Sequence, residues 1–160
     1  MICSLITATH GSDKDATMAL GAFGLTTNGS ASDLTVTTAA TTACTAITSL
    51  TGMQSLTVSL KFVYGAGGTS VKAYLQTSLD GGTTWDDIAC WAPSNANATK
   101  RWNFSALTPV TTPIVPTDGA MADNTAQDGI LGDRVRLKVV VVAATAYSGS
   151  TTLVGRMVAH

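Results

Sequence analysis

Ten acidic side chains, all of them aspartate, are the first candidates for acid–base chemistry or cation binding. Asp86 and Asp87 form an adjacent pair, but neighbouring residues of a strand point to opposite faces of a sheet. The two carboxylates therefore cannot face each other across a glycosidic bond, as a catalytic pair must. Four more aspartates follow at five-residue steps and could supply oxygen ligands to Ca²⁺: Asp118, Asp123, Asp128 and Asp133. They lack the tight alternating spacing of a calcium loop, so the sequence favours turn and capping roles for them.

The other reactive side chains are isolated in the sequence. His10 and His160 stand near opposite ends of the chain, and neither has a partner at a spacing typical of a metal site. No serine lies in a nucleophile elbow, and no glycine-rich segment carries the lysine of a phosphate-binding loop. The three cysteines have no CxxC spacing and are predicted to be reduced, mostly buried thiols: Cys3, Cys44 and Cys90. The sequence therefore predicts a protein that is not an enzyme and needs no metal or other cofactor.

One motif is sharp. The segment 78–85 matches the Asp-box pattern Ser-x-Asp-x-Gly-x-Thr-Trp, known from sialidase-type propellers and other β proteins, at five positions: Ser78, Asp80, Gly82, Thr84 and Trp85. In those proteins the motif is a fold-stabilising turn outside the catalytic centre and occurs in several copies. A single copy in 160 residues is too few for a propeller. We therefore interpret it as a structural hairpin that turns a strand at 71–77 back into a strand at 85–91.

Three tryptophans could form a second kind of site. Trp85, Trp91 and Trp102 could line a sugar-binding face, because aromatic rings stack well on apolar faces of ligands. The sequence favours a role in the core or in subunit contact over glycan binding. A carbohydrate-binding module stays open as the alternative function of a different class.

The elements that must position these residues are strands. Period-two alternation of apolar and polar residues is regular in four segments: 56–62, 71–76, 135–141 and 151–159. It is less regular in five others: 2–8, 16–22, 34–38, 88–91 and 101–104. A short helix over 41–50 is an open alternative, although the threonines there favour extended chain. Eight or nine short antiparallel strands in one domain of 160 residues predict a β-sandwich of jelly-roll type.

Composition narrows the function further. Charged residues make up 12% of the chain and its net charge is −1, so no overall field would attract nucleic acid or anionic lipid. No apolar stretch approaches the roughly 18 residues of a membrane span, and the N-terminus lacks the basic start of a signal peptide. We expect synthesis in a cytoplasm. With 45% hydrophobic residues and few charges to protect strand edges, much of the surface is expected to be covered by copies of the chain or by a partner.

Two segments are the expected contact regions: an N-terminal arm over 1–12 and a long, proline-containing loop over 108–133. The loop is predicted to bind a partner or to lie on a neighbour. The residues singled out for partner contact are large apolar side chains and prolines: Ile2, Leu5, Ile6, Trp91, Trp102, Pro113 and Pro116.

The segments 71–89 and 128–139 resemble sequences of small structural proteins of tailed bacteriophages and prophages. The resemblance implies a virion protein made in the cytoplasm of a bacterial host. Its most specific form is a capsid decoration protein, self-associated as a trimer on the major capsid protein. A head–tail connector, neck or tail-associated protein is the alternative within the virion. The resemblance carries no catalytic residues with it.

Overall fold

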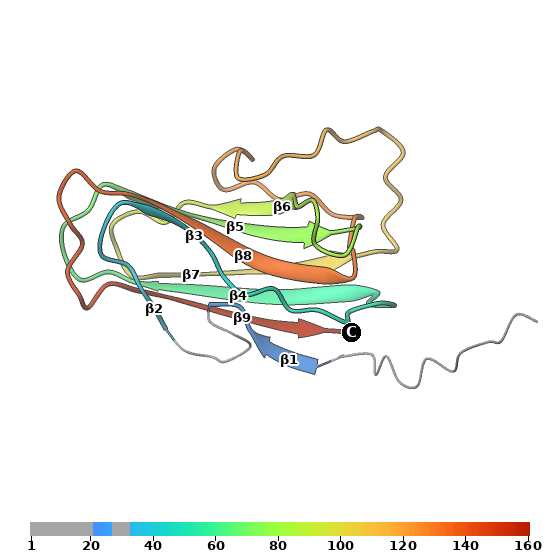
Figure 1. Cartoon of the computed structure of the whole chain (residues 1–160), viewed down its shortest axis with the longest axis horizontal. Coiled ribbons are helices and arrows are strands. Elements are labelled where there is room, and N and C mark those ends of the chain that lie inside the picture. The colour runs from blue at the N-terminus through green and yellow to red at the C-terminus, as the bar shows by residue number, and fades with distance from the viewer. Residues whose placement is uncertain (1–20, 27–32) are drawn as a thin grey trace, which may run out of the picture.

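The computed structural model describes residues 21–26 and 33–160, and within them the chain is all-β. Nine strands form two antiparallel sheets (Figure 1) and no helix is present in these ranges. The strands are β1 (Gly21–Gly24), β2 (Leu34–Thr35), β3 (Ala40–Ala43), β4 (Ser55–Val63), β5 (Ser70–Ser78), β6 (Asp86–Trp91), β7 (Ala98–Ser105), β8 (Arg134–Val142) and β9 (Thr152–Ala159). The predicted fold class is confirmed.

The strand order is that of a jelly roll. The five-stranded sheet has the order β1-β9-β4-β7, with β2 also paired to β9, and the four-stranded sheet has the order β3-β8-β5-β6. Strands therefore pair from the middle of the chain outward: β5 with β6, β4 with β7, β3 with β8 and β2 with β9. Alternate pairs lie in opposite sheets, as when one long hairpin is rolled up into a sandwich.

The four regular alternating segments become β4, β5, β8 and β9, and two of the weaker ones become β6 and β7. Of the predicted segment 34–38 only Leu34–Thr35 is strand, and of 16–22 only the last two residues are described, as part of β1. The alternative helix over 41–50 is wrong, because β3 and extended chain occupy that region. Residues 2–8 lie outside the described ranges.

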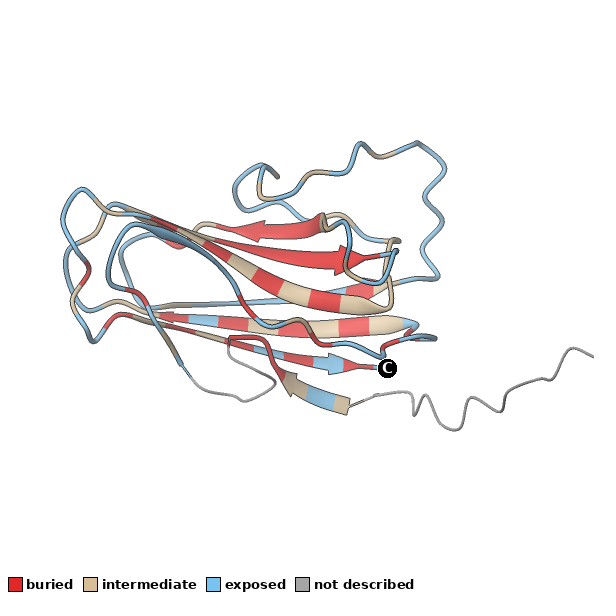
Figure 2. Cartoon of the chain, in the orientation of Figure 1, coloured by how far each residue is buried: buried red, intermediate tan, exposed pale blue. Residues whose placement is uncertain are grey.

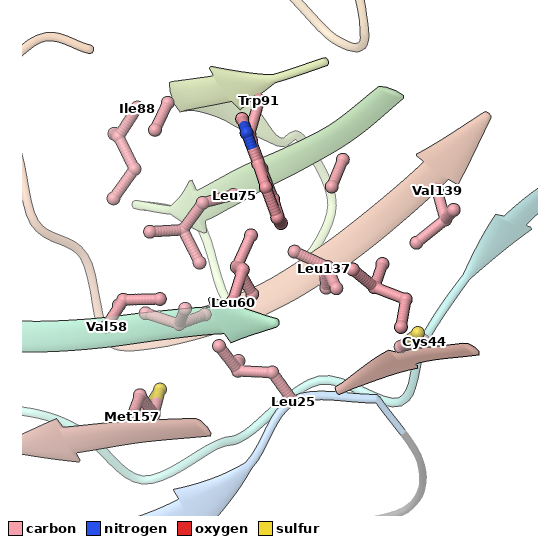
Figure 3. Close-up of a cluster of buried hydrophobic side chains, with 14 of the residues drawn as sticks. Leu25, Cys44, Val58, Leu60, Leu75, Ile88, Trp91, Leu137, Val139 and Met157 are labelled. Carbon is pink, nitrogen blue, oxygen red and sulfur yellow. The ribbon is translucent and has the colours of Figure 1, made fainter. Parts of the chain in front are cut away.

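The core lies between the two sheets. In β4 the side chains of Leu56, Val58, Leu60 and Phe62 are buried while the residues between them face outward (Figure 2), as period two requires. Side chains of β5 and β8 meet them from the other sheet, together with Trp91 of β6 (Figure 3). Burial of apolar area at about 25 cal/mol per Å² is the main stabilising contribution.

The loop 108–133 packs on its own chain. Figure 1 shows this segment, in gold and orange, above β6 and β5. The Asp87 N–H donates to the Thr117 carbonyl (2.8 Å) and the Gln127 N–H donates to the Ile88 carbonyl (2.9 Å), so the loop pairs with the outer edge of β6. The outer edge of β6 thus finds its hydrogen-bond partners within the chain. Contact of the loop with a neighbour stays a prediction.

Candidate functional site

The hairpin between β5 and β6 is organised by the carboxylate of Asp80. It accepts hydrogen bonds from the backbone N–H groups of Thr83 (3.0 Å) and Thr84 (2.8 Å) and from the hydroxyl of Thr84 (2.8 Å). The Ser78 hydroxyl donates to Asp80 (2.9 Å) and accepts from the Gly82 N–H (2.8 Å). Gly82 has a φ of +93°, which a side chain would disfavour. The motif residues thus form one closed turn that joins the two strands.

Trp85 closes this turn on the side of the four-stranded sheet. Its indole N–H donates to the Gly82 carbonyl (3.1 Å), and the guanidinium of Arg136 from β8 lies 4.1 Å from the ring centroid. A cation over an indole face at this distance is attractive. The ring therefore ties the hairpin to the sheet, and Arg136 occupies one of its faces.

The Asp80 turn predicts a pH effect on stability. Hydrogen bonds from the Thr84 N–H and hydroxyl lower the pKa of Asp80 from the ordinary 3.8 to about 2. Because the folded-state pKa is depressed, the stabilisation is complete above the unfolded pKa and is lost as the pH falls from about 4 towards 2. We expect Asp80→Asn to lower the thermal midpoint at pH 6, with the gap to the native protein closing below pH 4. A gap that is constant from pH 6 to pH 2 would contradict this.

A buried polar network lies under the loop. The Asp87 side chain belongs to a residue that is 1% exposed, and it accepts N–H groups of Gly119 (2.8 Å) and Ala120 (3.0 Å). The Thr117 hydroxyl (2.8 Å) and the Gln76 side-chain amide (2.8 Å) also donate to it. Each lone pair that burial removes from water is thereby given a donor. The Asp87 carboxylate therefore holds the loop against β6.

Next to it, Asp118 at the loop meets two cations of β8. Lys138 Nζ lies 2.8 Å and an Arg136 terminal nitrogen 3.7 Å from its carboxylate, which also accepts from the Gln76 amide (2.7 Å). The hydrogen bond from Lys138 is the first cause of a lowered pKa of Asp118. Both acids of this network accept hydrogen bonds from the chain, so the network holds the loop on the sheet.

The four aspartates at five-residue steps diverge. Asp123 pairs with Lys72 (2.7 Å), whereas Asp128 accepts the Ser105 N–H (2.6 Å) as a cap. Asp133 lies beside Arg134, and Asp118 belongs to the network above. Across the residues 21–26 and 33–160, no three acidic, histidine or cysteine side chains gather as metal ligands.

The tryptophans do not share a face. Trp91 is 2% exposed and points into the core between the sheets (Figure 3), so its assignment as a partner contact is wrong. Trp102 of β7 is half-buried and packs against the core, and Trp85 lies beneath Arg136. β6 has only six residues and most of them are buried, so its sequence shows no clear alternation that would have predicted the burial of Trp91. Pro113 and Pro116 are exposed on the loop; Ile2, Leu5, Ile6, Cys3 and His10 lie outside the described residues.

The outer face of the five-stranded sheet carries a group of cations that the sequence analysis did not assemble. Ser59 of β4 is opposite Arg101 of β7 on one side and Arg156 of β9 on the other. Lys61 follows on β4 in the next outward position. We call the outer surface around Lys61, Arg101 and Arg156 the cationic face. A shallow depression of about 370 Å³ lies there, lined by Asp33, Ser59, Lys61, Val63, Thr99, Arg101, Val154 and Arg156.

No family model, curated protein or solved structure matches the chain. The described ranges also hold no helix with the length and apolar character of a membrane span. The site must therefore be interpreted from its own geometry. Two features stand out: a face closed by the chain's own loop, and an opposite face with exposed cations.

Proposed function

We propose that the chain is a structural protein of a tailed-phage virion, most specifically a capsid decoration protein that acts through protein–protein contacts. The observation that carries the proposal is the asymmetry of the jelly roll. The loop covers β5 and β6 of one sheet, while the described residues leave the outer face of the other sheet open. Jelly rolls build viral capsid and lectin domains, which is support by analogy of fold.

Particle composition tests the proposal. Particles induced from the strain that encodes the chain are purified on a density gradient, and the copy number of the chain is measured by quantitative mass spectrometry. A decoration protein is expected at a copy number comparable to that of the major capsid protein. A few copies per particle would favour the neck or tail alternative. Absence from intact particles would contradict the virion proposal.

Self-association is part of the proposal. Two large apolar side chains are strongly exposed, Val115 on the loop at 85% and Leu107 in the turn after β7 at 73%. We infer that these side chains are covered when copies of the chain meet. We expect an oligomer, a trimer in the decoration proposal, in light scattering coupled to size exclusion. Changing Val115 and Leu107 to aspartate should shift the protein towards monomer. Thr111→Asp, on the loop that carries Val115, should not. A monomer at all concentrations would contradict self-association in solution.

A further inference from the structure

The cationic face has a defined geometry that follows from strand register. Arg101 and Arg156 both lie opposite Ser59, so the three residues form a row across β7, β4 and β9. Two strand spacings place the arginine Cα atoms about 10 Å apart, and Lys61 lies about 7 Å along β4 from Ser59. The small serine between two guanidinium groups leaves room for an anionic group that both could reach.

The cations of this face have no partner within the described part of the chain. All four ion pairs found there involve cations of the other sheet or its loop: Lys72, Arg134, Arg136 and Lys138. Lys61, Arg101 and Arg156 are exposed, and Asp33 is the one acid among the residues that line the depression. Three cations against one carboxylate leave a net positive surface.

The chain itself shows how such a face is covered. On the four-stranded sheet, outward cations of β5 and β8 are met by aspartates of the loop: Lys72 by Asp123, and Lys138 by Asp118. An acidic loop with turn residues thus seals a sheet that carries alternating cations. The cationic face repeats this pattern of outward cations, so its charge is complementary to an acidic segment of the same kind.

We propose that the cationic face docks an acidic segment or surface of a different virion protein, through carboxylates set about 7–10 Å apart. This inference rests on the proposed function. A second copy of this chain placed symmetrically on the face would set arginine against arginine, which disfavours a twofold contact there. A nucleic acid fits less well, because three cations in a shallow depression lined by Ser, Thr and Val give neither a long phosphate track nor an aromatic ring for base stacking.

Peptide binding to the full chain tests this docking. The probe is an extended peptide of alternating Asp and Thr, whose carboxylates on one side repeat about every 7 Å; the control peptide has Asn in place of Asp. In nitrogen-15 amide spectra we expect the Asp peptide to shift signals of Ser59, Lys61, Arg101 and Arg156. Affinity should fall about tenfold in the double variant Arg101→Glu/Arg156→Glu and weaken with added salt.

Lys100→Glu is the matched control. Lys100 is exposed on the same strand, but it lies opposite the inward-facing Leu60 and so belongs to the other side of β7. This variant should keep the affinity within about threefold. Arg101→Gln/Arg156→Gln checks that loss of charge, rather than misfolding, causes the effect, and thermal melting verifies the fold of all three variants. Equal loss in Lys100→Glu, shifts on another face, or tighter binding of oligodeoxythymidine than of the Asp peptide would overturn the inference.

Particle incorporation separates this inference from the proposed function. If the native chain is found in particles and the double glutamate variant is lost while Lys100→Glu is retained, both are supported. If the native chain and the double variant are incorporated equally, the docking inference fails and the virion proposal stands. If the native chain is not incorporated at all, the virion proposal fails, and the peptide experiment still decides whether the face binds carboxylates.

Discussion

Replacing Asp87 with asparagine is expected to lower the free energy of unfolding by about 2–4 kcal/mol. The carboxylate accepts hydrogen bonds from the N–H groups of Gly119, Ala120 and Met121 and from the Thr117 hydroxyl. An asparagine of the same shape turns one acceptor oxygen into a donor and removes the charge. Buried N–H groups of the loop would then face an N–H group, and a buried donor without an acceptor is costly.

Urea unfolding would measure the loss of global stability, and hydrogen exchange would measure the local opening of the loop. Exchange of the amides at 117–127 should speed up more than exchange of β4, because the loop opens before the sandwich does. Asp86→Asn is the matched control: Asp86 is half-buried, and burial is the first cause of its raised pKa, so its charge is unfavourable in the fold. Its removal should leave stability equal or slightly higher. Equal losses in both variants would show that Asp87 does not fasten the loop.

The dependence on Asp87 shows where sequence reasoning stops. Its partners on the loop lie some thirty residues away, and no local period links them. In β5, Lys72, Tyr74 and Gln76 alternate with apolar residues as if they faced water. Tyr74 and Gln76 are in fact buried, because the loop covers the outer face of that strand. Period two identifies the strand and its inward side, but it cannot reveal what lies on the other side.

The sandwich, in contrast, was predictable, because many short alternating strands with one apolar face need a second sheet to cover that face. The strand order was not predictable, since no local pattern says which strands pair. The hairpin was predictable as well, since the hydrogen bonds that close the turn all run between residues of the motif itself. The cationic face was not, because Lys61, Arg101 and Arg156 come from three segments that only the strand register brings together.

Trp91→Ala is expected to have the largest effect on stability, about 3–5 kcal/mol. The indole is 2% exposed and lies between the sheets, packed with residues of β4, β5 and β8 (Figure 3). Its removal leaves a cavity that two hydrogen-bonded sheets cannot close without moving as wholes, so most of the lost contact is not recovered. Urea unfolding followed by circular dichroism would measure the loss.

Trp102→Ala provides the comparison, because Trp102 lies on an edge strand, is half-buried and leaves a space that water can enter. We expect a clearly smaller loss of stability from it. The pair also distinguishes core from contact surface. Trp91→Ala could instead keep the native stability and abolish self-association or particle binding. The indole would then have to face a partner, and the pairing of Trp91 with Ala73 would be wrong. A large loss of stability in the isolated protein places it in the core, because burial against the chain itself needs no partner.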